Sequence, residues 1–286
     1  HNIAQARFYY ASGDGVKPYE SKYEGADPGV PHPGARDIRE GMKYGWRKPI
    51  AEASAFQSHF AIAEAGDRMV DGWVHKNNPL AMEVWGHISR YMTFLQEHQE
   101  FYTEVACVSK VGVVAPPHIP SFEVSLARES LYNALVEMNI MYDVLLLHRL
   151  TPEMLAPYKA IIIPNIPWIE ESQMAAIQAY KNAGGKIFTI GSTPPLRDLA
   201  DLAAPAALLG KLGEAAAREE LRGQMAALEG APLITLTSAP YVAANVVRKR
   251  GTDRLVIHFV NYDKPLRGVR VRLNLEELPV KLNRKK

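Results

Sequence analysis

Four short apolar runs, each followed by chain-breaking residues, constrain the fold of this 286-residue chain more than any other feature. The runs are Val111–Ala115, Asp143–Leu147, Ala160–Ile163 and Lys186–Ile190. Proline or glycine follows each run within a few residues, which favours strands over segments of buried helices. The runs are nearly all apolar, as in strands that are covered on both faces of a parallel sheet.

Two stretches between these runs have the apolar spacing of helices. Ser125–Met138 and Ser172–Ala183 repeat apolar side chains every three or four residues, and Gly184-Gly185 ends the second stretch. The alternation of strand and helix predicts an α/β fold with a flavodoxin-like, doubly wound parallel sheet.

The flanking segments also have recognisable patterns. Residues 50–71 and 79–104 are predicted to form two helices, and Asn78-Pro79 is a good start for the second. Downstream, Leu255–Val260 is predicted to be a strand that includes His258 in a structural role. The alternation in Val269–Leu273 predicts a half-buried strand whose arginines face solvent.

Open parallel sheets bind ligands beyond the carboxyl ends of their strands, so the residues after each run are the candidates for a site. They are His118, His148, Asn165 and Ser192. The neighbouring Trp168, Gly191 and Thr193 are added to Asn165 as candidate ligand-binding residues.

The phrases SLARESLYNALVEMNIMYDVLLL and YKAIIIPNIPWIEESQMAAIQAYKNAGGKIFTIGS resemble a domain of beta-galactosidase-related glycoside hydrolases. That domain, often called the trimerisation domain, is flavodoxin-like and follows the catalytic barrel. It is itself similar to class I glutamine amidotransferase domains. The flanking phrases EVWGHISRYMTFLQEHQEFY and RLVIHFVNYDKPLRGVRVRLNL resemble the last helices of the barrel and the small β domain of these enzymes. The resemblance covers roughly residues 50–280.

The resemblance implies four segments. Residues 1–49 are an irregular, loop-rich segment, and 50–108 are a helical segment like the end of a barrel. Residues 109–232 are the flavodoxin-like domain, and 233–286 are a small, incomplete β domain. A glycosidase barrel needs about 250 residues, so most of the barrel is expected to be absent, together with the two carboxylates that cleave glycosides. Glu52 and Glu64 are predicted to be solvated or capping residues and not an acid/base pair.

The main functional prediction is therefore an accessory and oligomerisation region related to glycoside hydrolases. A homo-oligomer is expected, with dimerisation through residues 50–104, and carbohydrate is the expected ligand. No cofactor, metal, nucleic acid or membrane partner is predicted.

An enzyme is the alternative. Gly191-Ser192-Thr193 stands where the amidotransferase relatives have a cysteine nucleophile, and serine replaces the cysteine. If the strands before His148 or His118 neighbour the strand that ends at Ile190, an imidazole could activate Ser192 for hydrolysis of an ester or lactone. Two weaker alternatives are a non-catalytic, amidotransferase-like binding domain and a metal site built from His118 and His148 with Glu123 or Asp198.

Charge and cysteine content narrow the remaining classes. Residues 245–286 contain twelve Lys/Arg and four Asp/Glu, and these basic residues are predicted to lie on solvated faces, since no nucleic-acid motif accompanies them. Cys107 is the only cysteine and is predicted to be buried and inert. No run approaches the roughly 20 apolar residues of a membrane span, and no signal peptide is visible, so a soluble, cytoplasmic protein is the default expectation.

Overall fold

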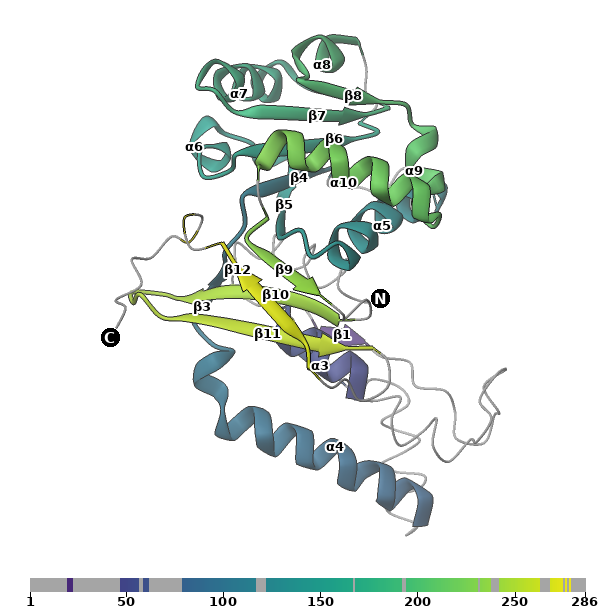
Figure 1. The fold of residues 1–286 in the computed structure, drawn as a ribbon, viewed down its shortest axis with the longest axis vertical. Coiled ribbons are helices and arrows are strands. Elements are labelled where there is room, and N and C mark those ends of the chain that lie inside the picture. Colours follow the sequence, from purple (N-terminus) through teal and green to yellow (C-terminus); the bar gives the residue numbers. More distant parts are fainter. Residues whose placement is uncertain are drawn as a thin grey trace. The chain divides into compact units, whose positions relative to one another are not determined.

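The computed structural model describes residues 20–22, 47–56, 59–61, 79–116, 122–166, 168–191, 194–230, 232–237, 242–262, 268–274, 276 and 278. The described residues belong to two compact units. One unit contains those of 106–258 and 268–278, and the other contains those of 20–105 and 259–262. The elements of each unit are labelled in Figure 1.

A five-stranded parallel sheet forms the centre of the first unit. Its strand order is β5-β4-β6-β7-β8, and each neighbouring pair is parallel. The strands are β4 (Val111–Ala115), β5 (Tyr142–Leu146), β6 (Ala160–Pro164), β7 (Lys186–Ile190) and β8 (Leu202–Ala204). Counted along the chain, this order is 2-1-3-4-5, which is the flavodoxin-like order. The predicted fold class is confirmed.

The boundaries of the four predicted strands agree closely with the structure. The first and fourth have the predicted ends, the second begins one residue earlier at Tyr142, and the third continues to Pro164. The connecting helices are α5 (Phe122–Glu137), α6 (Pro152–Leu155), α7 (Glu171–Asn182), α8 (Pro194–Leu199), α9 (Ala207–Lys211) and α10 (Ala215–Glu229). The two helices predicted between these strands are therefore confirmed as α5 and α7.

One large apolar core joins the sheet to α6, α7 and α8. Leu155, Ile177 and Leu196 come from these three helices and pack into the same cluster as the side chains of β4 and β6. Gly112 in β4 has no room for a side chain, because a Cβ there would overlap the side chain of Leu145 in the neighbouring strand. The glycine lets the two strands and their side chains pack closely.

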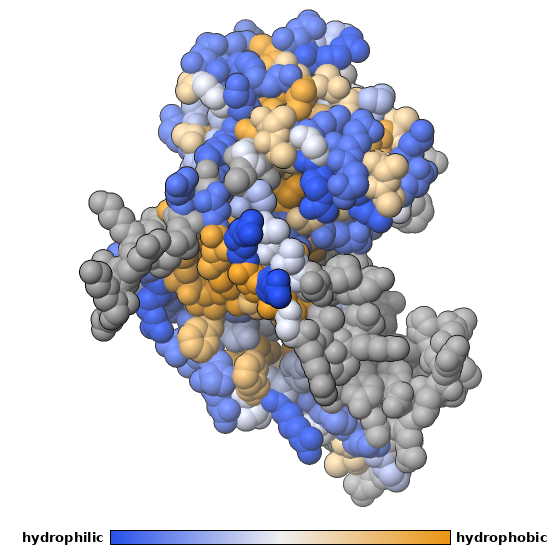
Figure 2. Space-filling view, in the orientation of Figure 1, coloured by the Kyte–Doolittle hydropathy of each residue, from blue (hydrophilic) through white to orange (hydrophobic). Residues whose placement is uncertain are grey.

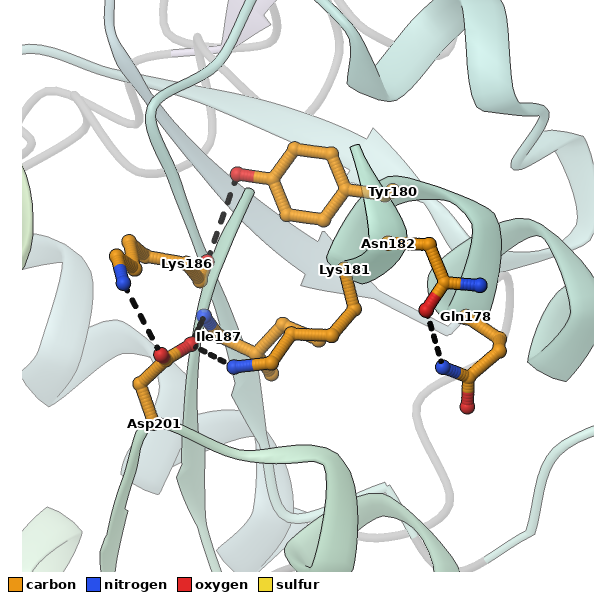
Figure 3. Close-up of polar contacts among 7 residues, drawn as sticks. All are labelled: Gln178, Tyr180, Lys181, Asn182, Lys186, Ile187 and Asp201. Atoms are coloured by element: carbon orange, nitrogen blue, oxygen red, sulfur yellow. Dashed lines mark hydrogen bonds and ion pairs between the residues drawn. The ribbon is translucent and has the colours of Figure 1, made fainter. Parts of the chain in front are cut away.

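Asp201 connects three elements at the amino end of β7, as Figure 3 shows. Its Oδ2 accepts a hydrogen bond from the backbone N–H of Ile187 at 2.8 Å and pairs with Lys181 Nζ at 2.6 Å. Lys186 Nζ lies 3.4 Å from Oδ1. Burial raises the pKa of Asp201, but hydrogen bonds from Lys181 and Ile187 and the positive charge of Lys181 outweigh it, so the pKa lies below its usual value. The ionised carboxylate therefore stabilises the junction of α7, β7 and the turn before β8.

We expect Asp201→Asn to lower the free energy of unfolding at pH 7 by about 1 kcal/mol, a value that allows for solvent screening of this partly exposed group. Because the folded-state pKa is depressed, the stabilisation is present above the unfolded-state pKa of about 3.9 and is lost as the pH falls through the folded-state value. Urea unfolding of wild type and variant between pH 7 and about pH 2.5 should show the difference shrinking. The matched control is Asp198→Asn, an exposed carboxylate on α8, which should change stability little.

The rest of the first unit is built from antiparallel and mixed strands. A three-stranded sheet has the order β11-β10-β3, and β9 pairs with β12 in an antiparallel two-stranded sheet. The strands are β3 (Val105–Cys107), β9 (Ile234–Thr237), β10 (Val242–Lys249), β11 (Leu255–Asn261) and β12 (Arg270–Leu273). Their apolar side chains form a second core around Ile234 and Val246. Figure 2 shows hydrophobic side chains gathered over β10, β11 and β12.

Three predictions in this region have different outcomes. The strand predicted at Leu255–Val260 is confirmed as β11, and His258 is buried in it. In β12 the arginines are exposed as predicted, but Val271 is 42% exposed too, because this strand pairs only with β9 and is covered on neither face at that point. Cys107 is half-buried, not fully buried as predicted, and its Sγ donates to Asn245 Oδ1 at 3.3 Å.

The second unit contains α3 (Arg47–Ala55), the parallel pair β1 (Glu20–Lys22) and β2 (His59–Ala61), and α4 (Pro79–Glu97). The predicted helix over 50–71 is wrong beyond Ala55, because His59–Ala61 pairs with β1 instead. The predicted helix over 79–104 begins at Pro79 but ends at Glu97, before the 3₁₀ turn η2 (Gln99–Phe101). Among the described helices, none is both long and apolar enough to cross a membrane.

Candidate functional site

The strand order defines a switch point at the carboxyl end of the parallel sheet. After β4 the chain crosses to β5 on one side, and it then returns to place β6 on the other side of β4. Ligands of doubly wound sheets bind where the crossover direction changes in this way, because the connections separate there and leave a crevice. The switch point lies between Pro116, after β4, and Asn165, after β6.

Asn165 and Gly191 turn the chain sharply at the ends of β6 and β7. Asn165 has a φ of 45° and Gly191 a φ of 65°, both in the left-handed region. The backbone N–H of Asn165 donates to Ile190 O at 2.6 Å, and that of Gly191 donates to Ala204 O at 2.8 Å. These two hydrogen bonds join the ends of three adjacent strands and make the rim of the sheet a rigid edge.

A side chain at position 191 would not fit. A Cβ there would lie 2.6 Å from Ala206 Cβ and 2.9 Å from Ala206 Cα, and the positive φ is strained for any residue with a side chain. The described contacts of Asn165 and Gly191 thus give both residues a role in the backbone, and their predicted role in ligand binding stays a prediction.

Trp168 is the most exposed large apolar side chain among the described residues, at 61%. It lies between Ile166, which is buried, and Ile169, which packs against the main core. Directly after it, the backbone N–H of Glu170 donates to Gln173 Oε1 at 3.0 Å, which closes a capping box at the start of α7. Both neighbours of the indole are thus anchored, and the ring is presented to solvent from a fixed backbone.

The predicted serine and histidine residues are not brought together by the strand order. His148 is exposed in the 3₁₀ turn η3 (Leu147–Arg149) after β5. Two strands separate β5 from β7, which puts the two strands about 14 Å apart at about 4.8 Å per strand. β6 separates β4 from β7 as well. The condition that these strands neighbour β7 is therefore not met.

Three of the predicted site residues, His118, Ser192 and Thr193, lie outside the described residues. The pairing of Ser192 with an imidazole stays a prediction. In the part of the chain that the structure describes, no group of three His, Cys, Asp or Glu side chains could hold a metal ion.

A buried carboxylate in the second unit was not anticipated. Glu52 in α3 is 4% exposed, so its predicted solvated position is wrong. It interacts with Tyr262, which follows β11: burial, the charge of Glu52 and a hydrogen bond with it all raise the pKa of the tyrosine hydroxyl. The buried Phe56 lies one helical turn after Glu52, and this spacing was a sequence signal for a buried face. The other predicted carboxylate, Glu64, lies outside the described residues.

We expect Gly191→Ala to lower the free energy of unfolding by about 1–3 kcal/mol, because the added Cβ overlaps Ala206 and the left-handed backbone is strained. The matched control is Gly210→Ala in α9, where a Cβ meets nothing within 4 Å and helix propensity favours alanine by up to about 1 kcal/mol. Chemical denaturation of both variants measures the difference. Equal effects of the two substitutions would contradict the close approach at the rim.

Comparisons with known proteins bear on the fold of the chain. No protein-family model matches the sequence, and no curated protein matches it. Among solved structures, alpha-L-fucosidase isoenzyme 2 from Paenibacillus thiaminolyticus is similar, with a TM-score of 0.67 and 13% sequence identity. The similarity covers 96% of this chain and 56% of the fucosidase chain, so this chain spans about half the length of that protein.

Two other solved structures have lower scores. The apo exo-carrageenase GH42 from Bacteroides ovatus has a TM-score of 0.42 at 11% identity and covers 79% of this chain and 33% of its own. The flavodoxin from Megasphaera elsdenii has a TM-score of 0.28 at 16% identity and covers 38% of this chain and 98% of its own. At these identities a likeness shows the fold alone, and the similarity to the fucosidase shows that this chain has a glycoside-hydrolase-like fold.

Proposed function

We propose that this chain is an accessory region of a glycoside-hydrolase-related protein, which associates with copies of itself and contacts carbohydrate at the carboxyl rim without cleaving it. The observation that carries the proposal is the similarity to the fucosidase, which extends over 96% of this chain but over only 56% of that protein. The chain also resembles the flavodoxin-like trimerisation domain, which stands outside the catalytic barrel in beta-galactosidase-related enzymes.

Trp168 supports contact with carbohydrate. An indole presents a flat apolar face beside a polar N–H, and sugar rings offer apolar C–H faces beside hydroxyl groups. An exposed tryptophan on a rigid turn loses little conformational entropy when it binds, since its anchored neighbours Ile166 and Ile169 already hold the backbone. The switch point, where doubly wound sheets bind their ligands, lies between β4 and the strand that leads to this residue.

The helix α4 supports self-association. Met82 and Phe94 are 44% and 48% exposed, and Ile88 is the one fully buried side chain among those of α4 whose burial is described. The ring of His98 lies 4.5 Å from that of Phe94 and 6.1 Å from that of Phe101, which makes an aromatic cluster at the end of the helix. Apolar side chains exposed along one helix are typical of an interface with a protein partner.

We expect the purified chain to sediment as an oligomer at about 50 µM, which requires a dissociation constant near or below about 10 µM. Met82→Asp combined with Phe94→Asp should shift it to the monomer, because two carboxylates would be desolvated in the interface. The matched control is Thr93→Asp combined with Gln96→Asp, which adds the same charge at exposed polar positions of α4. A monomeric wild type, or equal effects of both double variants, would contradict association through α4.

Trp168→Ala should weaken binding of a neutral oligosaccharide about tenfold, and Trp168→Phe should retain part of the affinity, because stacking needs an aromatic face. The measurement is affinity electrophoresis against fucosylated and galactosylated oligosaccharides. The matched control is Phe259→Ala, an exposed aromatic side chain of the second unit, which should leave binding unchanged.

Two results would contradict this part of the proposal. One is an affinity that does not change in Trp168→Ala. The other is turnover of nitrophenyl glycosides or esters by the wild type, and if that turnover is lost in a folded Ser192→Ala variant, the serine hydrolase alternative is established in place of an accessory role.

A further inference from the structure

The turn between β10 and β11 concentrates positive charge at one end of the hairpin. The seven residues from 248 to 254 include Arg248, Lys249, Arg250 and Arg254, and Asp253 is the only acid among them. The three arginines are exposed and Lys249 is half-buried. We call residues 248–254 the basic turn; its formal charge is +3.

Backbone and side-chain hydrogen bonds hold the basic turn in one conformation. The N–H of Lys249 donates to Arg254 O at 3.0 Å, and the N–H of Thr252 donates to Lys249 O at 3.2 Å. The hydroxyl of Thr252 donates to Lys249 O at 3.1 Å and accepts from the N–H of Arg254 at 3.2 Å. Gly251 supplies the left-handed φ of 69° that the turn requires. The charges are therefore presented from a preorganised backbone, which lowers the entropy lost on binding.

This arrangement of charge works against folding stability. Lys249 and Arg254 are opposite each other across the hairpin, as their backbone hydrogen bond shows, and like charges in opposed positions destabilise a strand pair. Arg248 and Arg250 add to the repulsion from adjacent positions in the chain. A cluster that costs stability in the free protein is explained if an anionic ligand neutralises it.

We propose that the basic turn binds an acidic polysaccharide, whose sulfate or carboxylate groups are bound by the arginines. Guanidinium groups form paired hydrogen bonds with such oxyanions, and three of the four cations here are arginines. The basic turn contains no aromatic residue on which unpaired bases could stack, which disfavours single-stranded nucleic acid. The choice of a carbohydrate polyanion rests on the proposed function.

The test compares binding of dextran sulfate with binding of unsulfated dextran of the same length, by the full chain at about 50 mM salt, where screening is moderate. The triple variant Arg248→Gln, Arg250→Gln and Arg254→Gln should bind dextran sulfate about tenfold more weakly, and the salt dependence of binding should become shallower. The matched control is Arg197→Gln, Lys211→Gln and Arg222→Gln, which removes three exposed charges from other parts of the same unit. It should change the affinity less than about twofold.

The outcomes are separable from those of the proposed function. Trp168→Ala should leave binding of dextran sulfate unchanged, so a failure at the rim and a failure at the basic turn are distinguished. Equal losses in the two triple variants would show a non-specific charge effect and overturn the proposal. Tighter binding of a 20-nucleotide DNA of mixed sequence than of dextran sulfate, with the same dependence on the three arginines, would overturn the assignment to a polysaccharide.

Discussion

Burial of the central strands on both faces is the constraint on which the rest of the structure depends. Residues 160–163 of β6 are fully buried, as are Val111, Val113, Val114 and Ala115 of β4. Backbone groups at these positions can be satisfied only by neighbouring strands, and parallel neighbours require crossover connections that cover the sheet with helices. Those crossovers place the carboxyl ends of β4 and β6 side by side, which creates the switch point.

The rim shows how a rigid scaffold can present an exposed recognition residue. Asn165 and Gly191 adopt left-handed conformations, and their backbone hydrogen bonds to Ile190 and Ala204 join three strand ends. The indole of Trp168 is exposed only a few residues further along the chain. Because the backbone under it is fixed, exposure of a large apolar ring is better explained by a ligand than by loose packing. Asp201 plays the corresponding structural part at the opposite end of β7, where its carboxylate joins α7 to the sheet.

The proposals place three functions in different parts of the chain. The rim with Trp168 contacts neutral sugar, α4 mediates association between copies, and the basic turn binds acidic polysaccharide. Each rests on side chains that folding leaves exposed although burial or charge compensation would be more favourable: an indole, a phenyl ring and a cluster of guanidinium groups. Such side chains are more informative about function than the conserved packing of a core, because stability alone does not account for them.

The sequence by itself determined the parallel sheet, since a run such as Val111–Ala115, ended by prolines, has few alternatives to a buried strand. It also indicated the helices α5 and α7 and the exposure of the arginines in β12. Tertiary structure decided the strand order, which separates β5 from β7 and leaves His148 far from the end of β7. It also buried Glu52 against Tyr262 and made His59–Ala61 a strand beside β1. Local patterns report which face of an element is apolar, but contacts between residues hundreds of positions apart depend on which surfaces remain to be covered when the chain closes on itself.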